Sequence, residues 1–333
     1  MAAKTGLCYK DVLSAMSRIR AYVHETPVLT SRVLDEMAGL QLYFKAENMQ
    51  KTGAFKARGA CNAVFALLEE QKKDPSLAVP GIVTHSSGNH GQAVAYAARC
   101  AKVPCSVVVP SDTPPVKCEA IQAYGAELVF CEPNPTARKQ TAAAIASKTG
   151  YCLVHPFDNY NVMAGQGTVA LELLRQVPDL DAILVTISGG GLTSGIAVAT
   201  NAIRPACTVF AVEPEGKLLG RCLAAKQRLW SSPPQYLDTI ADAIRSQQVG
   251  ELTFPILCSL VSPEVFTVTD QQMLDGMTLS LQTTKVLVEA AAGAAVYASV
   301  HQLNKSHPHI KKAGVILCGG NTDYTPLPQK TLS

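Results

Sequence analysis

The sequence predicts an α/β protein whose parallel sheets are covered by helices on both faces. Runs of β-branched residues alternate with Ala-rich helical runs along most of the chain. The strand runs are apolar throughout, which is typical of strands buried on both sides. At 333 residues the chain exceeds the size at which one hydrophobic core keeps growing, so we expect two domains. The composition agrees, since 47% of the residues are apolar and 17% are charged, which argues against disorder.

Strands and helices follow one another in an order that favours parallel pairing. We expect strands at 82–84, 105–110, 127–130, 183–187, 208–212 and 314–317, and helices at 92–101, 116–124 and 192–203. A polar turn at 86–91 follows the first of these strands, and a glycine-rich turn at 188–191 follows the fourth. A strand that leads through a turn into a helix and on to another strand is the unit of a parallel sheet. No linker or repeat marks a domain boundary.

Charge and cysteine content place the chain in a broad class. The net charge of +3 comes without a long basic run, so we expect neither a nucleic acid nor a membrane surface as a partner. The first thirty residues carry scattered charges, and the most apolar stretch, 286–300, contains Glu289. We therefore expect no signal peptide and no membrane span. Eleven cysteines without a C-x-x-C pair favour reduced thiols over a disulfide or zinc framework, and with them a cytoplasmic location.

Three segments far apart in the chain share one chemistry. Segment 51–56 ends in Lys56, segment 188–191 reads Ser-Gly-Gly-Gly, and segment 315–321 places Cys318 at the end of an apolar run. A lysine amine forms a Schiff base with an aldehyde, and a glycine turn at a helix start binds phosphate through backbone N–H groups. Pyridoxal phosphate (PLP) requires both. Together the three segments predict a PLP site.

Each of these segments also has a simpler explanation. An isolated run of glycines can be an ordinary tight turn, and this one is neither a G-x-G-x-x-G fingerprint nor a Walker loop. Lysine is most often a surface residue, but the small and aromatic neighbours of Lys56 predict a desolvated amine with a lowered pKa. Arg58, two residues further on, is expected to be structural.

The turn at 86–91 and Glu289 supply further candidates. Ser86, Ser87 and Asn89 offer hydroxyl, amide and N–H groups suited to a carboxylate, while a polar turn with a capping serine is the simpler alternative. His90 is either a base or, as we expect, a hydrogen-bonded structural residue. Glu289 lies in an apolar run, where an unpaired carboxylate is costly. It either caps the Ala-rich helix that follows or faces a polar ligand.

Six segments resemble the serine racemase and serine/threonine dehydratase family of fold-type II PLP enzymes. They read KTGAFKARGA, THSSGNHGQA, IQAYGAELVFCEP, AGQGTVALELL, SGGGLTSG and LCGGNTD, and they span nearly the whole chain. The resemblance implies a small α/β domain at 81–157 inserted into a large one formed by 1–80 and 158–333, with PLP between them. It also implies a homodimer.

The same resemblance implies a role for each candidate residue. Lys56 is the Schiff-base lysine, and the glycine-rich turn holds the phosphate. The residues implied in cofactor binding are Phe55, Lys56, Asn89, Ser188, Gly189, Gly190, Gly191, Glu289 and Cys318. Those implied at the substrate carboxylate are Ser86, Ser87, Asn89, His90, Arg138 and Ser246. In the racemases a nucleotide binds at the dimer interface. Six residues of this chain resemble the lining of that site, namely Lys51, Thr52, Gln92, Tyr124, Lys285 and Asn321.

Several positions depart from the family pattern. The racemases hold a divalent metal with a glutamate and an aspartate six residues later, but here Glu213 is followed by Leu219, with Lys217 between them. One carboxylate is a poor site for Mg²⁺ or Ca²⁺, so we expect no metal site. Serine racemases have a serine in place of Cys318, and animal aspartate racemases have a run of serines in place of 155–157.

Ser87 decides the predicted activity. Inverting Cα needs acid–base groups on both faces, and racemases carry a serine at this position where many threonine dehydratases carry alanine. We therefore expect catalysis by Lys56 and Ser87 in a racemase of a small hydroxy amino acid, which interconverts L- and D-serine and deaminates serine to pyruvate. The alternatives are a dedicated L-serine/L-threonine ammonia-lyase, an aspartate racemase or 3-hydroxyaspartate dehydratase, and a PLP-binding protein without turnover.

Overall fold

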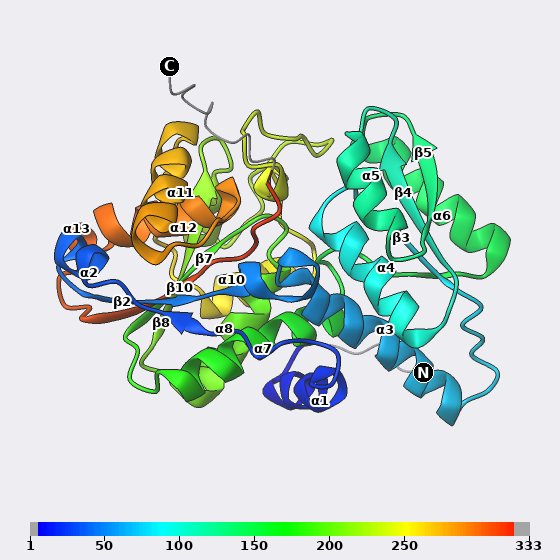
Figure 1. The fold of residues 1–333 in the computed structure, drawn as a ribbon, viewed down its shortest axis with the longest axis horizontal. Coiled ribbons are helices and arrows are strands. Elements are labelled where there is room, and N and C mark those ends of the chain that lie inside the picture. The colour runs from blue at the N-terminus through cyan, green and yellow to red at the C-terminus, as the bar shows by residue number, and fades with distance from the viewer. Residues whose placement is uncertain (1–5, 323–333) are drawn as a thin grey trace, which may run out of the picture.

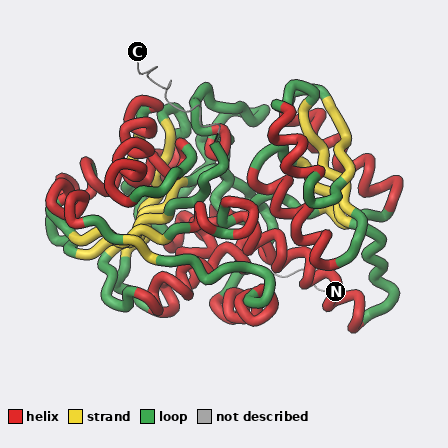
Figure 2. The backbone as a smooth tube through the Cα atoms, viewed as in Figure 1, coloured by secondary structure: helices red, strands yellow, loops and turns green. Residues whose placement is uncertain are grey.

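Two sheets lie side by side in the computed structural model, each flanked by helices (Figure 1). The structure describes residues 6–322. Residues 1–5 and 323–333, the outer ends of the expected large domain, lie outside this range, and with them Asp323, the last residue of the LCGGNTD segment. Figure 2 shows the strands as two separate groups with helices and loops between them.

The larger sheet has six strands in the order β1-β2-β10-β7-β8-β9. Their bounds are β1 Val28–Leu29, β2 Gln41–Lys45, β7 Ala182–Thr186, β8 Thr208–Pro214, β9 Phe266–Val268 and β10 Lys312–Ile316. All neighbours are parallel except β1 and β2, which are antiparallel. The central strand β7 is buried throughout, and β10 is buried at all positions but Lys312. Such strands are covered on both faces.

The smaller sheet has four parallel strands in the order β5-β4-β3-β6. Their bounds are β3 Ile82–His85, β4 Cys105–Pro110, β5 Glu127–Cys131 and β6 Cys152–Leu153. Helices α3 (Lys56–Lys73), α4 (Asn89–Ala101) and α5 (Pro115–Gln122) share a core with one face of this sheet, and α6 (Pro135–Thr149) packs on the other.

The remaining helices cover the larger sheet and join it to the smaller one. They are α1 Tyr9–Ile19, α2 Arg32–Ala38, α7 Tyr160–Gln176, α8 Gly191–Ile203, α9 Leu219–Ala225, α10 Thr253–Leu260, α11 Asp270–Thr284, α12 Ala290–His301 and α13 Leu303–Ser306. Short 3-10 turns occur at η1 Glu47–Met49, η2 Lys51–Gly53 and η3 Asp242–Ile244. Helix α3 packs on α4 and on α7, and α7 packs on α8. A continuous layer of helices therefore connects the two sheets.

The predicted parallel α/β class is confirmed. All six predicted strands form within two residues of their expected bounds. The helix expected from 92 begins instead at Asn89, so the prediction of a turn up to Gly91 was wrong, and Asn89 and His90 belong to the first turn of α4. All strands of the smaller sheet fall within 81–157, but the domain boundaries themselves stay a prediction.

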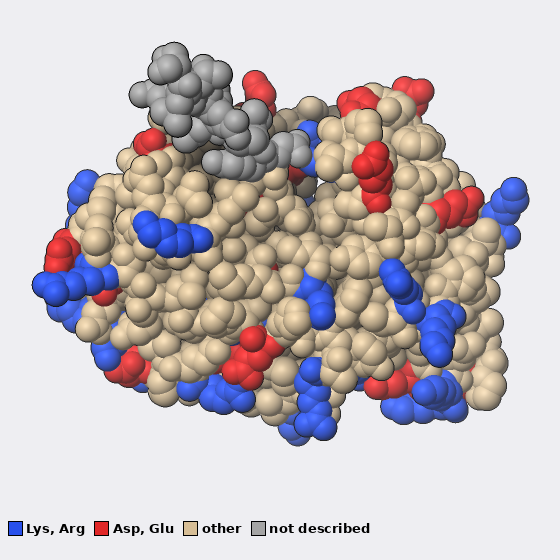
Figure 3. All heavy atoms as spheres, viewed as in Figure 1, with Lys and Arg blue, Asp and Glu red and all other residues tan. Residues whose placement is uncertain are grey.

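The face of the molecule drawn in Figure 3 carries charges of both signs. In Figure 3, Lys and Arg side chains are interspersed with Asp and Glu over the visible face. Between residues 6 and 322, no helix is both long and apolar enough to cross a membrane.

Candidate active site

A cavity of about 310 Å³ opens where loops of the two sheets meet, a size that suits a small molecule. Three parallel strands, β3, β7 and β10, end at this cavity, which is the usual place for a ligand in an α/β protein. The cavity is lined by every residue predicted for cofactor and substrate, namely Phe55, Lys56, Ser86, Ser87, Asn89, His90, Arg138, Ser188, Gly189, Gly190, Gly191, Ser246, Glu289 and Cys318. The structure thus brings these residues together, while their roles stay a prediction.

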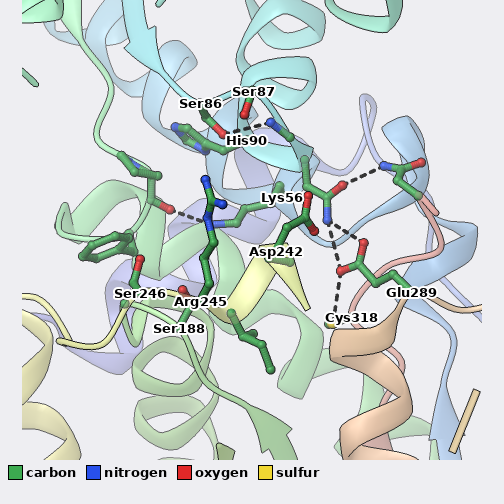
Figure 4. Close-up of a pocket in the computed structure, with 18 of the residues that line it drawn as sticks. Lys56, Ser86, Ser87, His90, Ser188, Asp242, Arg245, Ser246, Glu289 and Cys318 are labelled. Carbon is green, nitrogen blue, oxygen red and sulfur yellow. Dashed lines mark hydrogen bonds between the residues drawn. The ribbon is translucent and has the colours of Figure 1, made fainter. Parts of the chain in front are cut away.

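Lys56 is the first residue of α3, and its amine faces the cavity (Figure 4). Nζ donates a hydrogen bond to the carbonyl oxygen of Pro156 at 2.7 Å and lies 5.2 Å from the centroid of the Phe55 ring. Burial lowers the pKa of Lys56 to about 8, although the electrostatic influence of the nearby Cys318 and Glu289 opposes this shift. The predicted lowering of the pKa is confirmed in direction. Near neutral pH, a sizeable fraction of this amine is therefore unprotonated and able to act as a nucleophile or base.

A buried ion-pair network fixes the helix that carries Lys56. Arg58 is fully buried and donates to the carboxylates of Glu47 at 2.7 and 2.8 Å and of Glu172 at 2.6 and 2.8 Å. Lys45 donates to the same Glu172 at 2.7 Å. The structural role expected of Arg58 is confirmed. Because these partners lie on β2, η1 and α7, the network anchors the first turn of α3 to the larger sheet.

The glycine-rich turn joins β7 to α8 and has no room for side chains. A Cβ on Gly189 would lie 2.2 Å from the ring of Phe157, and Gly190 has a φ of +92°, in the left-handed region. The carbonyl of Gly189 accepts hydrogen bonds from the Thr253 hydroxyl at 2.8 Å and from the Gly250 N–H at 3.0 Å. Because the first N–H groups of an α-helix lack helical partners, the start of α8 at Gly191 is suited to bind an anion such as a phosphate.

A chain of polar groups lines the side of the cavity where β10 ends. The Asn89 amide donates to both carboxylate oxygens of Glu289, at 3.1 and 2.9 Å, and accepts from the Asn321 amide at 2.8 Å. The Cys318 thiol donates to Glu289 at 3.6 Å and accepts from the Thr186 hydroxyl at 3.5 Å. Burial raises the pKa of Glu289 to about 7 and raises the pKa of Cys318 well above its usual value. The thiol of Cys318 is therefore neutral.

Glu289 resolves the choice left open by the sequence. Its backbone occupies the N-cap position of α12, but its side chain makes no capping hydrogen bond. The carboxylate instead faces the cavity (Figure 4). A Cβ on Gly319 would lie 2.8 Å from this carboxylate, so the glycine makes room for it.

The turn after β3 places two serines at the cavity and a histidine beneath it. Ser86 and Ser87 lie beside the cavity (Figure 4), and the Ser86 hydroxyl accepts from the Gly88 N–H at 3.4 Å. His90 is buried, and its Nε2 lies 3.2 Å from the carbonyl oxygen of Val154. Burial lowers the pKa of His90 far below its usual value, so the ring is neutral and donates Nε2–H to that carbonyl. This is the structural histidine that we expected.

Sequence reasoning predicted Arg138 at the cavity but missed a second cationic group, Arg245, on the wall opposite Glu289. Arg138 on α6 donates a hydrogen bond to the Tyr236 hydroxyl, and the Arg245 guanidinium lies 4.4 Å from the centroid of the Tyr236 ring. Both arginines line the cavity. Lys117 on α5 and Asp242 on η3 form an ion pair at its edge. The Arg138–Tyr236 and Lys117–Asp242 pairs join segments about a hundred residues apart, and no local pattern marks them.

Comparison with known proteins decides which ligand this cavity serves. Residues 19–319 match the family described as pyridoxal-phosphate dependent enzymes. The chain belongs to this family. It is 42% identical to a serine racemase of Dictyostelium discoideum over 96% of each chain, and 42% identical to human serine racemase over 98% of this chain and 94% of that protein. Its structure resembles that of a PLP-dependent aspartate racemase, with a TM-score of 0.92 and 50% identity over 98% of this chain and 99% of the other.

The cavity fits the cofactor of this family. Lys56 offers a buried amine of lowered pKa, and the glycine-rich turn presents backbone without side chains to the cavity. Arg138 Nε is buried without a hydrogen-bond partner, so the wall opposite Glu289 retains a donor for a further anionic group. The protein is thus a PLP-dependent enzyme, and the cavity between the two sheets is its candidate active site.

The residues at the expected metal position do not fit a divalent cation. The Glu213 carboxylate is buried and accepts from the Leu219 N–H at 2.8 Å and from the Thr267 hydroxyl at 3.4 Å. Lys217 is fully buried beside it, and the charge of Glu213 acts on its amine. Within residues 6–322, no group of three or more His, Cys, Asp and Glu side chains could hold a metal ion.

Proposed function

We propose that this enzyme is a racemase that interconverts L- and D-serine and also converts serine to pyruvate and ammonia. The observation that carries the proposal is the presence of the Lys56 amine and the Ser87 hydroxyl in one cavity, supplied by different elements (Figure 4). Inversion at Cα needs a group that removes a proton on one face and another that delivers one to the opposite face. The serine racemases that share 42% identity over almost the full length support this substrate.

The proposal assigns the cofactor-binding residues as follows. Lys56 would bind the aldehyde carbon covalently, Phe55 would pack against the ring, and the turn Ser188–Gly191 with the start of α8 would bind the phosphate. Asn89 would hydrogen-bond the ring hydroxyl, Glu289 would lie beside the ring, and Cys318 would contact the ring nitrogen. When bound, PLP supplies a conjugated ring that stabilises negative charge at the substrate Cα.

Two side chains of the protein then move the protons. Lys56, freed when the substrate amine takes its place at the aldehyde carbon and with a pKa lowered to about 8 by burial, removes the Cα proton of L-serine from its own face. The Ser87 hydroxyl delivers a proton to the other face, and in the reverse direction it removes that proton. Ser86, Arg138, Ser246 and the backbone N–H groups at the start of α4, among them that of His90, bind and orient the substrate carboxylate.

Cys318 limits the range of reactions. Its neutral thiol is a weak hydrogen-bond donor, so it stabilises positive charge on a ring nitrogen less than a carboxylate does. This favours racemisation and loss of the β-hydroxyl over transamination. The same observation favours the second candidate function, a dedicated L-serine/L-threonine ammonia-lyase.

The two arginines in the cavity favour a third candidate, a dicarboxylic amino acid as substrate. Arg138 and Arg245 both face the cavity, and the structure that shares 50% identity is that of an aspartate racemase. The segment 155–157 argues against it, because the Phe157 ring fills the space beside Gly189 and the Pro156 carbonyl holds Lys56. A β-carboxylate gains no hydroxyl donors from this segment.

Product analysis distinguishes the three candidates. L-serine, D-serine, L-threonine and L-aspartate are incubated with the PLP-loaded enzyme, and chiral chromatography is combined with a keto-acid assay. We expect D-serine and pyruvate from L-serine. Keto acid without any D-enantiomer supports the ammonia-lyase, and D-aspartate as the main product supports the dicarboxylate candidate.

Lys56→Ala tests the assignment of the amine. We expect the visible absorbance of bound PLP and all turnover to be lost, and borohydride treatment of the wild-type enzyme to add the phosphopyridoxyl mass to the peptide that carries Lys56. Lys51→Ala, five residues earlier and outside the cavity lining, is the control and should keep both signals. Mass found on another lysine would refute the assignment.

The same proposal includes a homodimer, a cytoplasmic location, a nucleotide effector and the domain limits at 81 and 157. Of the residues suggested for the nucleotide, Asn321 donates to the carbonyl of Thr52 at 2.7 Å, which supports a shared site for these two. Sedimentation with and without ATP measures both the dimer and the effector.

A further inference from the structure

Lys217 is a buried lysine for which the proposed reaction has no role. Its side chain is fully buried. It lies in a tight turn between β8 and α9, in which Gly216 and Leu218 adopt the left-handed φ values of +83° and +62°. The carbonyl of Lys217 accepts from the indole N–H of Trp230 at 2.6 Å. The turn therefore directs the lysine inward, although burial of an ammonium group is costly unless it is compensated.

The compensation comes from backbone oxygens. Nζ of Lys217 donates to the carbonyl of Ser246 at 2.5 Å and to that of Gln247 at 3.2 Å. Burial lowers the pKa of Lys217 to about 7, whereas the charge of the buried Glu213 carboxylate opposes this shift and favours the ammonium form. Backbone carbonyl oxygens are also ligands of a hard cation such as Mg²⁺ or Ca²⁺. Here the Lys217 ammonium lies where two of them converge.

The segment held in this way is a wall of the active site. Residues 245–247 pair with 235–237, since the N–H of Leu237 donates to Arg245 at 2.7 Å and that of Gln247 donates to Gln235 at 3.2 Å. Arg245, Ser246 and Tyr236 line the cavity. Lys217 thus holds the paired segments 235–237 and 245–247 from the side away from the cavity. Their other side lines the cavity.

The same segment continues to the glycine-rich turn. Arg228 donates to the carbonyls of Val249 at 3.0 Å and Gly250 at 3.1 Å. The Gly250 N–H in turn donates to the Gly189 carbonyl. Two fixed cations, Lys217 and Arg228, therefore hold the carbonyls of 246–250, and this segment connects the substrate wall to the cradle for phosphate.

We infer that the Lys217 ammonium is a built-in cation that takes the place of a bound metal ion and positions residues 245–250 of the active-site wall. Lys217 is a positioning residue, because it acts through Ser246 and Gln247 and does not line the cavity. The inference rests on the proposed function only in taking this cavity as the active site. Melting temperature and PLP affinity test it without reference to the substrate.

The test compares holoenzymes under different cations. We expect the melting temperature of the wild type to be unchanged by EDTA, Mg²⁺ or Ca²⁺. Lys217→Ala should lower it by about 5 °C or more, since two buried carbonyls lose their donor, and should weaken PLP binding and raise KM more than it lowers kcat. Ammonium chloride should restore part of each loss, whereas tetramethylammonium chloride at equal ionic strength should not. Lys305→Ala, at an exposed site, is the control and should respond to neither salt.

Two results would overturn the inference. One is a fall in the wild-type melting temperature on chelation that Mg²⁺ or Ca²⁺ reverses. The other is an equal response of Lys217→Ala to both salts, which would mark a general loss of stability. If Lys217→Ala yields no folded protein, Lys217→Met keeps the side-chain length without the charge. In that variant, an unchanged melting temperature and KM would refute the inference, and losses of both would support it. If the wild-type enzyme itself does not turn over serine, the proposed function is contradicted. The melting temperature and PLP affinity would still test the role of Lys217.

Discussion

At the scale of single residues, the proposed racemisation depends on Ser87. If its hydroxyl serves the face opposite Lys56, Ser87→Ala should suppress conversion of L- to D-serine by about a hundredfold or more, the usual effect of losing one general acid–base group. Pyruvate formation from L-serine should largely survive, because Lys56 still removes that proton. Chiral chromatography and a pyruvate assay on the same samples measure both rates.

Ser86→Ala is the matched control for this prediction. Ser86 lines the same cavity but is assigned to the substrate carboxylate, so its loss should raise KM for both reactions alike. Equal losses of both reactions in Ser87→Ala would point to carboxylate binding by Ser87 as well. An unchanged rate of racemisation would favour the ammonia-lyase.

Glu289 makes the stability of the protein depend on pH. Burial raises its pKa to about 7 in the folded cofactor-free chain, above the value of about 4.3 in an unfolded chain. The folded state therefore binds the proton more tightly, and stability falls as pH rises between these two values. Glu289→Gln removes the titration and keeps an acceptor for Asn89. The variant should gain stability over the wild type by a few kcal/mol between pH 4 and pH 8.

Urea unfolding of the cofactor-free proteins at several pH values measures this difference. Glu36→Gln, which changes an exposed carboxylate with a side chain 65% accessible, should show no comparable trend. A difference between Glu289→Gln and wild type that is constant over this pH range would contradict the raised pKa.

At the scale of elements, the position of Lys56 depends on the buried network below it. Arg58→Met would leave the carboxylates of Glu47 and Glu172 buried without their main partner. Breaking such a buried pair costs about 3–5 kcal/mol, and the first turn of α3 should lose its fixed position. We expect a large fall in melting temperature and weaker PLP binding.

The exposed pair Arg32–Glu36, with side chains 92% and 65% accessible, provides the comparison. Arg32→Met should change stability by only about 0.5 kcal/mol. Differential scanning calorimetry measures the melting temperatures of the two variants. Similar melting temperatures would mean that the buried network contributes little.

Elements that bury one long apolar stretch could be predicted from the sequence, and short edge elements could not. Strand β4 was predicted at its observed bounds, because six consecutive apolar or small residues precede a turn. Strands β1 and β6 have two residues each, too few for any pattern to form. The start of α4 was misplaced because Asn89, His90 and Gly91 are typical turn residues, and burial of His90 against Val154 is a tertiary contact.

The same distinction holds for the site. Lys56 and the glycine-rich turn could be recognised because their chemistry lies within a few consecutive residues. Tyr236 and Lys117 gain their place from partners 98 and 125 residues away, and Arg245 stacks on Tyr236, so sequence reasoning overlooked them. Lys217 was noted only as an interruption between two expected metal ligands, since its contact with Ser246 depends on the tight turn around it.

At the scale of the whole molecule, the cavity is bridged by side chains from both sheets. Asn89 contacts Glu289, Arg138 contacts Tyr236, and Lys117 pairs with Asp242. The first residue of each pair belongs to the helices around the smaller sheet, and the second to segments around the larger one. The Lys117–Asp242 pair is the most exposed, with side chains 29% and 53% accessible, so salt should weaken it first.

Lys117→Met should therefore loosen the mouth of the active site without unfolding the protein. An exposed ion pair contributes about 0–1 kcal/mol, so the melting temperature should hardly change, while KM for serine should rise a few-fold because the closed arrangement is less populated. High salt should raise KM of the wild type towards that of the variant and leave the variant itself unaffected. Lys312→Met breaks the pair with Asp179, which is similarly exposed at 32% and 58% but does not line the cavity, and should change neither KM nor its salt dependence. If KM of wild type and Lys117→Met respond to salt alike, the Lys117–Asp242 pair does not hold the smaller sheet and its helices against the larger one. The contacts of Asn89 and Arg138 across the cavity must then do so.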